Sequence, residues 1–329
     1  MENLDEIDSK ILYYLDANAR QPFSKIGKKV RLHKNVVAYR VRKLIEKGII
    51  TGFYTNIDAF KLGYIGLRFL ISFQYASVSK RNEIINYFSQ NKNTWYIAEL
   101  EGSYDFVVNF WVKNIQSFHE FWDKTLKHYR NYFQNIHLSI YTKTYHYINS
   151  YLINESTAKK ERLVYEIINC GPSIGIESFD ASILQYLVDN ARIPLVEIAR
   201  NLNISSTMVT YRINKLKKQN IIQGFRVNID ISKLGLKYFT VNFQLKNYAK
   251  RKEIINYIKK NLHVKMIDNA IGTADIIVGL RSEDINRVHQ FIQHVQKKYS
   301  DSIKKYDYFY FLKLKKINFL PDLTKKQII

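Results

Sequence analysis

Two stretches of the chain align with each other without a gap: residues 8–63, DSKILYYLDANARQPFSKIGKKVRLHKNVVAYRVRKLIEKGIITGFYTNIDAFKLG, and residues 180–235, DASILQYLVDNARIPLVEIARNLNISSTMVTYRINKLKKQNIIQGFRVNIDISKLG. The offset of 172 residues pairs Ala19-Arg20 with Ala191-Arg192 and Asn56-Ile57-Asp58 with Asn228-Ile229-Asp230. Self-similarity over this length indicates a repeated structural unit.

The repeat continues after Gly235, where a deletion of two residues changes the offset to 170. Glu83-Ile84-Ile85-Asn86-Tyr87 then matches Glu253-Ile254-Ile255-Asn256-Tyr257. We therefore expect one unit written twice, divided into a helical domain at 1–62, a mixed domain at 63–148, a linker at 149–176 and the same two domains again at 177–234 and 235–329. Within the linker we expect a short helix over TAKKERLVYEII, residues 157–168, and a hinge near Cys170.

Composition supports a globular protein with a polyanionic partner. The 329 residues have 46% hydrophobic and 24% charged side chains, and the formal net charge is +22. An excess of positive charge this large favours DNA, RNA or an anionic membrane as partner. One cysteine excludes an intrachain disulfide and a multi-cysteine zinc site. The N-terminus lacks the pattern of a signal peptide and no apolar run is long enough to cross a bilayer, so we expect a cytoplasmic protein.

The first ~50 residues of each unit have helical periodicity. In the third expected helix, Val37, Val41 and Leu44 share one face, and Asn35, Ala38, Tyr39 and Arg42 lie opposite. Val209, Ile213 and Leu216 repeat the apolar face in the second unit. Three helices with a tight turn predict a helix-turn-helix in each unit.

The turn before the third helix is better encoded in the second unit. Asn203 suits a left-handed backbone conformation and Ser205 suits an N-cap. The first unit has Arg31 and His33 at these positions, so we expect its turn to be slightly less stable.

After Gly63 the pattern changes to strand, helix, strand, strand, helix, strand, which predicts a ferredoxin-like βαββαβ domain. The expected elements are 66–74, 80–90, 94–101, 104–112, 115–129 and 133–147. Two helices cover one face of such a sheet, so the other face needs a partner sheet, which the second unit can supply. The predicted fold class is α+β, a tandem repeat of a helix-turn-helix domain followed by a ferredoxin-like βαββαβ domain.

These residues resemble the leucine-responsive regulatory protein and asparagine synthetase C regulator (Lrp/AsnC) family of transcription regulators. The resemblance covers nearly the whole chain twice and rests on an ordered set of positions, including Asn18-Ala19-Arg20, Arg40-Val41 and Gly48-Ile49-Ile50. It implies DNA binding by the helical domains and effector binding and self-association by the βαββαβ domains. Family members usually carry one unit per chain and dimerise, so the duplication departs from the pattern.

The third helices are the expected readers of double-stranded DNA, since this helix of the motif enters the major groove. Between Arg20 and Lys47 there are ten basic residues against one acid, and between Arg192 and Lys218 six against one, so the first domain should make more phosphate contacts. An ordinary solvated helix surface would also show such positions. The candidate contacts are Lys34, Asn35, Tyr39, Arg40, Arg42, Lys43, Ser206, Thr207, Thr210, Tyr211, Arg212 and Asn214.

Two turns resemble the ligand loop of the family, which implies an amino acid or similar small molecule as effector. Glycine and aspartate at such a turn are also ordinary hairpin chemistry. The second turn has alanine where the first has tyrosine, so its pocket is expected to be altered or vacant. The candidate residues are Gly102, Ser103, Tyr104, Asp105, Gly272, Thr273 and Asp275.

Catalytic motifs are absent from the sequence, so we expect no enzyme, no metal and no cofactor. Two alternatives stay open. Some relatives of the family are siroheme (tetrapyrrole) decarboxylases with His and Tyr facing a large pocket, and this chain has Tyr141, Tyr145, His146 and Tyr147 in one expected strand. His119 matches His289 across the repeats on an expected helix. The other alternative is an architectural protein that binds DNA with little sequence preference.

Overall fold

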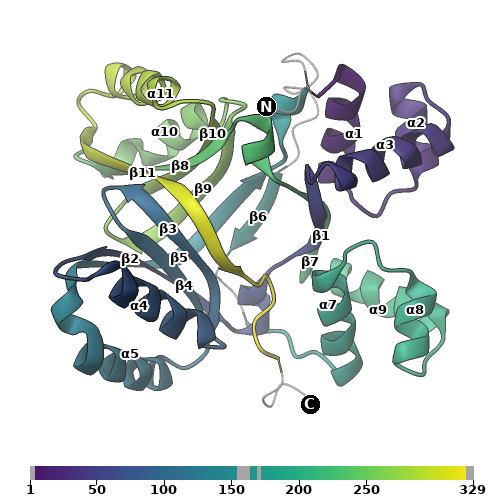
Figure 1. The fold of residues 1–329 in the computed structure, drawn as a ribbon, viewed down its shortest axis with the longest axis horizontal. Helices are drawn as coiled ribbons and strands as arrows, with labels where there is room; N and C mark the ends of the chain where they lie inside the picture. The colour runs from purple at the N-terminus through teal and green to yellow at the C-terminus, as the bar shows by residue number, and fades with distance from the viewer. Residues whose placement is uncertain (1–3, 154–163, 169–171, 324–329) are drawn as a thin grey trace.

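The two halves of the chain repeat one order of elements. The computed structural model describes residues 4–153, 164–168 and 172–323. Each half begins with a three-helix head and one strand: α1 (Glu6–Ala17), α2 (Phe23–Val30), α3 (Lys34–Glu46) and β1 (Ile50–Ile57) in the first, and α7 (Ser178–Asp189), α8 (Leu195–Asn201), α9 (Ser206–Lys218) and β7 (Ile222–Ile229) in the second. The two heads lie on the same side of the molecule (Figure 1).

The turns into α3 and α9 have the predicted backbone. Arg31 and Asn203 both adopt left-handed conformations, with φ of 57° and 53°. The Ser205 hydroxyl accepts a hydrogen bond from the Met208 amide at 3.1 Å, whereas Nδ1 of His33 accepts from Asn35 at 3.4 Å. The longer contact makes His33 the weaker cap, as the sequence predicted.

Each half then continues as βαββαβ. The first domain comprises β2 (Ile65–Phe73), α4 (Val78–Gln90), β3 (Thr94–Gly102), β4 (Phe106–Val112), α5 (Ile115–Tyr129) and β5 (Phe133–Tyr147). The second comprises β8 (Lys237–Leu245), α10 (Arg251–Ile258), β9 (Val264–Gly272), β10 (Ile276–Ser282), α11 (Ile285–Lys298) and β11 (Ile303–Ile317). The predicted fold class is confirmed.

The two sheets close into one barrel. Strand β3 pairs with β11, and β5 pairs with both β9 and β2, so the order β2-β4-β3-β11-β8-β10-β9-β5 returns to β2. Helices α4 and α5 cover one side of the barrel and α10 and α11 the opposite side (Figure 1). Alternation along β4 sends Phe106, Val108 and Phe110 into the core under α4 and α5, and turns the intervening side chains toward the barrel interior. The partner sheet is therefore the other half of the same chain.

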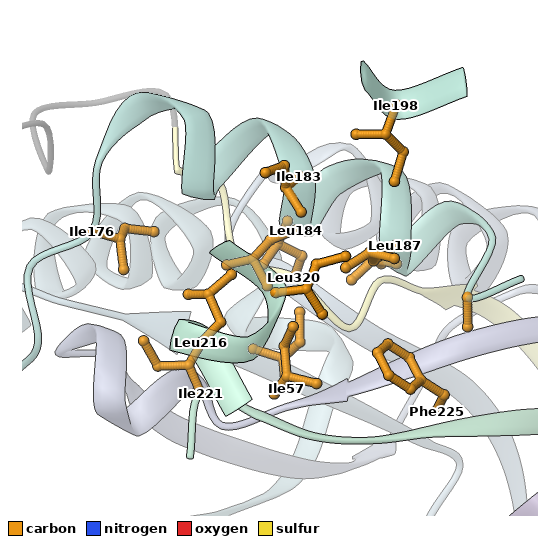
Figure 2. Close-up of a cluster of buried hydrophobic side chains, with 14 of the residues drawn as sticks. Ile57, Ile176, Ile183, Leu184, Leu187, Ile198, Leu216, Ile221, Phe225 and Leu320 are labelled. Carbon is orange, nitrogen blue, oxygen red and sulfur yellow. The ribbon is translucent and has the colours of Figure 1, made fainter. Parts of the chain in front are cut away.

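The heads are interwoven rather than separate. Strand β1 pairs with β7 in an antiparallel ribbon, with Thr55 opposite Phe225. Arg20 donates to the carbonyl oxygens of Ala191 and Ile193, and Arg192 donates to that of Ala19. One hydrophobic core joins Ile57 of the first half to side chains of the second half, among them Ile183, Leu184, Leu216 and Phe225 (Figure 2). The predicted boundaries at 62 and 234 coincide with short 3-10 helices, Ala59–Leu62 and Ile231–Leu234, but each head requires the strand of the other.

The linker contributes to the sheet. Residues 157–163 of the expected helix lie outside the described part of the chain, as does Cys170 at the expected hinge. The end of that segment is a strand, β6 (Val164–Ile168), so the prediction of a helix there is wrong. Strand β6 pairs with β5, with Tyr145 opposite Glu166, because β5 extends past the end of its pairing with β2 and offers an unpaired edge there. This edge decides the conformation of an otherwise ambiguous apolar segment.

Among the described residues, no helix is long and apolar enough to span a membrane.

Candidate DNA-binding surface and central cavity

The outward face of each third helix is open to solvent. Tyr39 on α3 is 57% exposed and Tyr211 on α9 is 64% exposed. Ser206 is half-buried. The remaining candidate contacts on these faces are exposed, namely Lys34, Asn35, Arg42, Lys43, Thr207, Thr210 and Asn214. Both faces thus present polar side chains at the spacing of a recognition helix.

Two of the candidate contacts are engaged inside the chain. Nη1 of Arg40 lies 2.6 Å from Asp5 and 2.9 Å from Asp8. Arg212 bonds Glu177 and Asp180 in the same way, and its side chain is only 12% exposed. These arginines hold the third helix to the start of the first helix, which gives them a structural role, and their contact with DNA stays a prediction.

Positive charge is unevenly distributed between the heads. Arg20 and Arg192 donate to carbonyls of the opposite head and are withdrawn from solvent. In the second head, Lys215 also contacts Glu177, and burial lowers the pKa of Lys217. The first head retains exposed Lys25, Lys28, Arg31, Lys34 and Arg42. The first head is therefore the more basic surface, as its composition suggested.

The two predicted ligand loops lie at the seams between the halves. Gly102 has φ of 122° and sits where a Cβ atom would come within 2.8 Å of the Tyr308 carbonyl oxygen. Asp105 accepts from the Phe73 amide at 2.7 Å and lies 3.1 Å from Arg81. Ser103 bonds the Tyr308 carbonyl, and the Tyr104 ring meets Phe309 edge-on.

The second loop repeats this arrangement. Gly272 packs against the Leu138 carbonyl, and Asp275 accepts from the Leu245 amide at 2.7 Å. Thr273 lies 3.5 Å from Ser139. In both loops the glycine lets strands of different halves approach closely, and the aspartate ties the loop to a strand of its own half, so both have a structural role.

A cavity of about 300 Å³ lies inside the barrel. Both sheets line it, together with the β1–β7 ribbon and the C-terminal segment through Phe319. Its wall carries ionisable groups that are unusual for a barrel interior, namely Arg68, Lys265, Asp268, Arg281 and His146. Burial raises the pKa of Asp268 to about 6, against opposing effects of the Thr144 hydroxyl and of Arg68.

Two of the four strand residues noted in the sequence reach this cavity. Tyr141 and His146 line it. Burial, with help from Arg226 and Lys265, lowers the pKa of His146 to about 3, so its imidazole is neutral at pH 7. Tyr145 and Tyr147 instead pack on the core beneath α10 and α11. His119 is exposed on α5, and the described residues contain no cluster suited to a metal ion.

Sequence reasoning missed the charged residues of the cavity. A signal was present, because Arg68 interrupts the apolar run IGLRFLISF and Asp268 stands within VKMIDNAIG. An isolated charge on an otherwise apolar strand marks a position that faces a partner or a cavity. Which positions share that cavity depends on how the two sheets meet.

Comparisons with known proteins agree with the two parts of the structure. Residues 4–45 match a family model described as the AsnC-type helix-turn-helix domain, and residues 177–223 match one described as winged helix-turn-helix DNA-binding. The chain is 36% identical over 118 residues to the HTH-type transcriptional regulator Ptr1 of Methanocaldococcus jannaschii, which is 36% of this chain and 78% of the relative. It is 32% identical over 120 residues to the HTH-type transcriptional regulator FL11 of Pyrococcus horikoshii, which is 36% of this chain and 78% of the relative.

A solved structure matches the whole architecture. The siroheme decarboxylase NirDL superposes with a TM-score of 0.63 over 95% of this chain and 93% of its own, at 13% identity. This likeness shows a shared duplicated fold. The sequence matches show more: this chain belongs to the Lrp/AsnC family of helix-turn-helix transcriptional regulators.

Proposed function

We propose that this protein is a transcription regulator that binds double-stranded DNA through two unlike heads carried on one chain. The observation that supports it is the pair of exposed polar recognition faces, with Tyr39 and Tyr211 at equivalent positions and a basic surround on the first head. Phosphate contacts would supply most of the affinity, and base contacts from α3 and α9 would set the sequence. Such a protein works in the cytoplasm.

The experiment that tests this proposal is a binding titration against the DNA upstream of its own gene and against an unrelated duplex of equal length, at two salt concentrations. We expect a preference on the order of 10³ that persists at the higher salt. Equal binding to both duplexes that collapses with salt would instead indicate an architectural DNA-binding protein.

The two heads should read different half-sites, because their outward faces share a tyrosine and little else. A homodimer with one head per chain reads a palindrome, whereas this chain joins unlike heads through the β1–β7 ribbon. Selection of binding sites from random DNA should enrich asymmetric sites. Enrichment of perfect palindromes would contradict the proposal, unless two chains supply matching heads.

The regulator would respond to a small-molecule effector, an amino acid or a similar molecule. The loops at Gly102–Asp105 and Gly272–Asp275 are one place for it, and their difference at Tyr104 and Ala274 would give one ligand per chain there. Calorimetry measures the stoichiometry, and two ligands per chain would contradict an asymmetric pair of loops.

A second candidate function is a decarboxylase acting on a tetrapyrrole. The observation that favours it is the fold likeness to NirDL over nearly the whole chain, together with cationic side chains in the cavity. The present cavity of about 300 Å³ lies at the small end of ligand pockets, which disfavours a macrocycle. An absorption spectrum of the purified protein distinguishes the two functions. A tetrapyrrole band in a protein that does not bind DNA would favour the decarboxylase over the regulator.

A further inference from the structure

The residues that line the barrel cavity differ between the two halves of the chain. With the offset of 170 residues, the repeat pairs Arg68 with Tyr238, Trp95 with Lys265, Trp111 with Arg281 and Ala98 with Asp268. All but Ala98 line the cavity. A homodimer would place each of these side chains twice around its axis, so this asymmetric wall exists only because both sheets belong to one chain.

Unsatisfied polar groups concentrate around this cavity. Among the described residues, fourteen buried side-chain nitrogen or oxygen atoms lack a hydrogen-bond partner, and nine of them belong to residues that line the cavity. The nine are Nδ2 of Asn56, Nε and Nη2 of Arg68, Nε1 of Trp95, Oδ1 of Asn109, Nε1 of Trp111, both carboxylate oxygens of Asp268 and Nε of Arg281. Buried polar groups are nearly always paired, so this concentration marks a place where a bound molecule supplies the partners.

Arg68 and Asp268 are the two charged members of this set that are almost completely buried. Arg68 is 4% exposed and Asp268 is 1% exposed. They influence each other electrostatically without meeting, since neither has the other as a hydrogen-bond partner. The Tyr141 ring lies 5.9 Å from the Arg68 guanidinium and the Thr144 hydroxyl acts on Asp268, but neither neighbour carries an opposite charge, and a buried charge that is not neutralised is strongly unfavourable. A ligand with an acidic group for the guanidinium and a cationic donor for the carboxylate satisfies both.

The cavity wall also carries aromatic side chains, two of them on β3 and β4. Trp95 and Trp111 stack with ring centroids 5.0 Å apart and an interplanar angle of 16°. Tyr141 and Phe311 continue this wall. A flat apolar body bound here would gain stacking and burial.

We propose that the barrel cavity binds one aromatic α-amino acid per chain, with its carboxylate on Arg68, its ammonium on Asp268 and its ring against Trp95 and Trp111. The cavity of about 300 Å³ lies at the small end of ligand pockets, which favours a ligand as small as a single amino acid. The inference deepens the proposed function, since the amino acid would be the effector of the regulator. The test of ligand binding uses no DNA, so ligand binding in the cavity and DNA binding by the heads can fail separately.

The first measurement is calorimetric titration of the full chain with L-phenylalanine, 3-phenylpropionate, which lacks the ammonium, and phenethylamine, which lacks the carboxylate. We expect one phenylalanine per chain and at least tenfold weaker binding of each truncated probe. Tryptophan fluorescence should change on binding, because Trp95 and Trp111 line the cavity, while Trp122 lies on α5 and packs against the core of the first domain. L-Leucine should bind at least tenfold more weakly than phenylalanine, since it offers no ring.

Three variants of the full chain locate the site, each checked for folding by circular dichroism. Arg68→Gln should lose at least tenfold in affinity for phenylalanine. Asp268→Asn should abolish the preference for phenylalanine over 3-phenylpropionate. Arg81→Gln, the matched control, disturbs the contact to Asp105 at the ligand loop and should leave the affinity unchanged.

Three results would overturn the proposal. Absence of binding by every probe at millimolar concentration means that water alone fills the cavity. Loss of binding in Arg81→Gln with retention in Arg68→Gln moves the ligand to the loops, and two ligands per chain contradict a single site in the cavity. Equal affinity for leucine and phenylalanine would show that the aromatic side chains of the cavity do not contribute to recognition of the ligand.

Discussion

At the scale of single residues, two arginines near each other on α3 differ in their contacts. Arg40 is held by Asp5 and Asp8, whereas Arg42 is exposed and has no ion pair with any described residue. The difference follows from helix geometry, since two positions along the helix turn a side chain to another face. The same reasoning separates Arg212 from Asn214 on α9.

We predict that Arg42→Ala weakens binding to the selected DNA site by about 1–3 kcal/mol if the side chain contacts a base. Arg40→Ala should instead lower the free energy of unfolding by about 1 kcal/mol or less, because its ion pairs are partly exposed. Fluorescence anisotropy with labelled DNA and urea unfolding measure the two effects. An Arg40→Ala variant of unchanged stability but lost DNA affinity would show that Arg40 acts as a DNA contact rather than as a structural ion pair.

Asp268 predicts a pH dependence of stability. Burial raises its pKa from 3.8 to about 6, so the folded chain binds this proton more tightly than the unfolded chain. The protonated carboxyl of Asp268 stabilises the folded chain fully below about pH 4. This stabilisation is lost as the pH rises to about 6, which lowers the free energy of unfolding by on the order of 2–3 kcal/mol.

Asp268→Asn should remove that loss, because asparagine does not titrate. We expect the variant to gain stability relative to the parent between pH 4 and pH 7, measured by urea unfolding without ligand. Parallel pH profiles for the two proteins would show that Asp268 is not the group responsible.

At the scale of elements, the helical heads follow local sequence rules. Capping and left-handed turn positions lie where the residue types favour them, and the departures from those rules are in the first head. Local rules failed for β6, because its conformation depends on the free edge of β5. Strand identity in a short apolar segment is decided by the available neighbour rather than by propensity.

Replacing the weak cap of α3 should stabilise the first head. We predict that His33→Ser raises the free energy of unfolding by about 0.5–1 kcal/mol, because a serine hydroxyl accepts the hydrogen bond from the Asn35 amide with better geometry than the imidazole does. The matched change Ser205→Ala should cost about 1 kcal/mol in the second head. Thermal unfolding followed by circular dichroism measures both, and a destabilised His33→Ser variant would mean that the imidazole has a packing role.

At the scale of the whole molecule, one buried ion pair ties the first head to the second half. Nε and Nη2 of Arg226 lie 2.8 Å and 2.7 Å from the two carboxylate oxygens of Asp16, and both residues are about 1% exposed or less. Nη2 of Arg226 and Nζ of Lys265 also donate to the Tyr147 carbonyl. Helix α1, ribbon strand β7 and barrel strands β5 and β9 thus meet at one point.

Removing one partner of this pair leaves the other buried and uncompensated. We predict that Arg226→Met costs about 3–5 kcal/mol of unfolding free energy. The double variant Asp16→Leu with Arg226→Met should recover part of this loss. Urea unfolding monitored by tryptophan fluorescence checks it, and a single variant that loses less than 1 kcal/mol would show that the pair does not join the halves.

Closure of the barrel predicts the oligomeric state. The edges of both sheets pair within the chain, through β3 with β11 and β5 with β9, so the sheet-to-sheet interface is complete in one copy. We expect light scattering to give the mass of one chain, 39.1 kDa, at all concentrations. A mass near twice this value would show that another surface mediates self-association.

The sequence by itself determined the duplication, the helix-turn-helix and βαββαβ order of each unit, and the outward faces of α3 and α9. These properties are carried by periodicity, capping and turn residues, which act over a few positions along the chain. The cavity residues, the role of Arg40 and the exchange of β1 and β7 were decided only by the tertiary structure. Arg68 and Asp268 stand 200 residues apart in sequence, and their shared environment arises from the closure of two sheets into one barrel. Contacts over such separations depend on which edges and faces meet, and no local pattern encodes that.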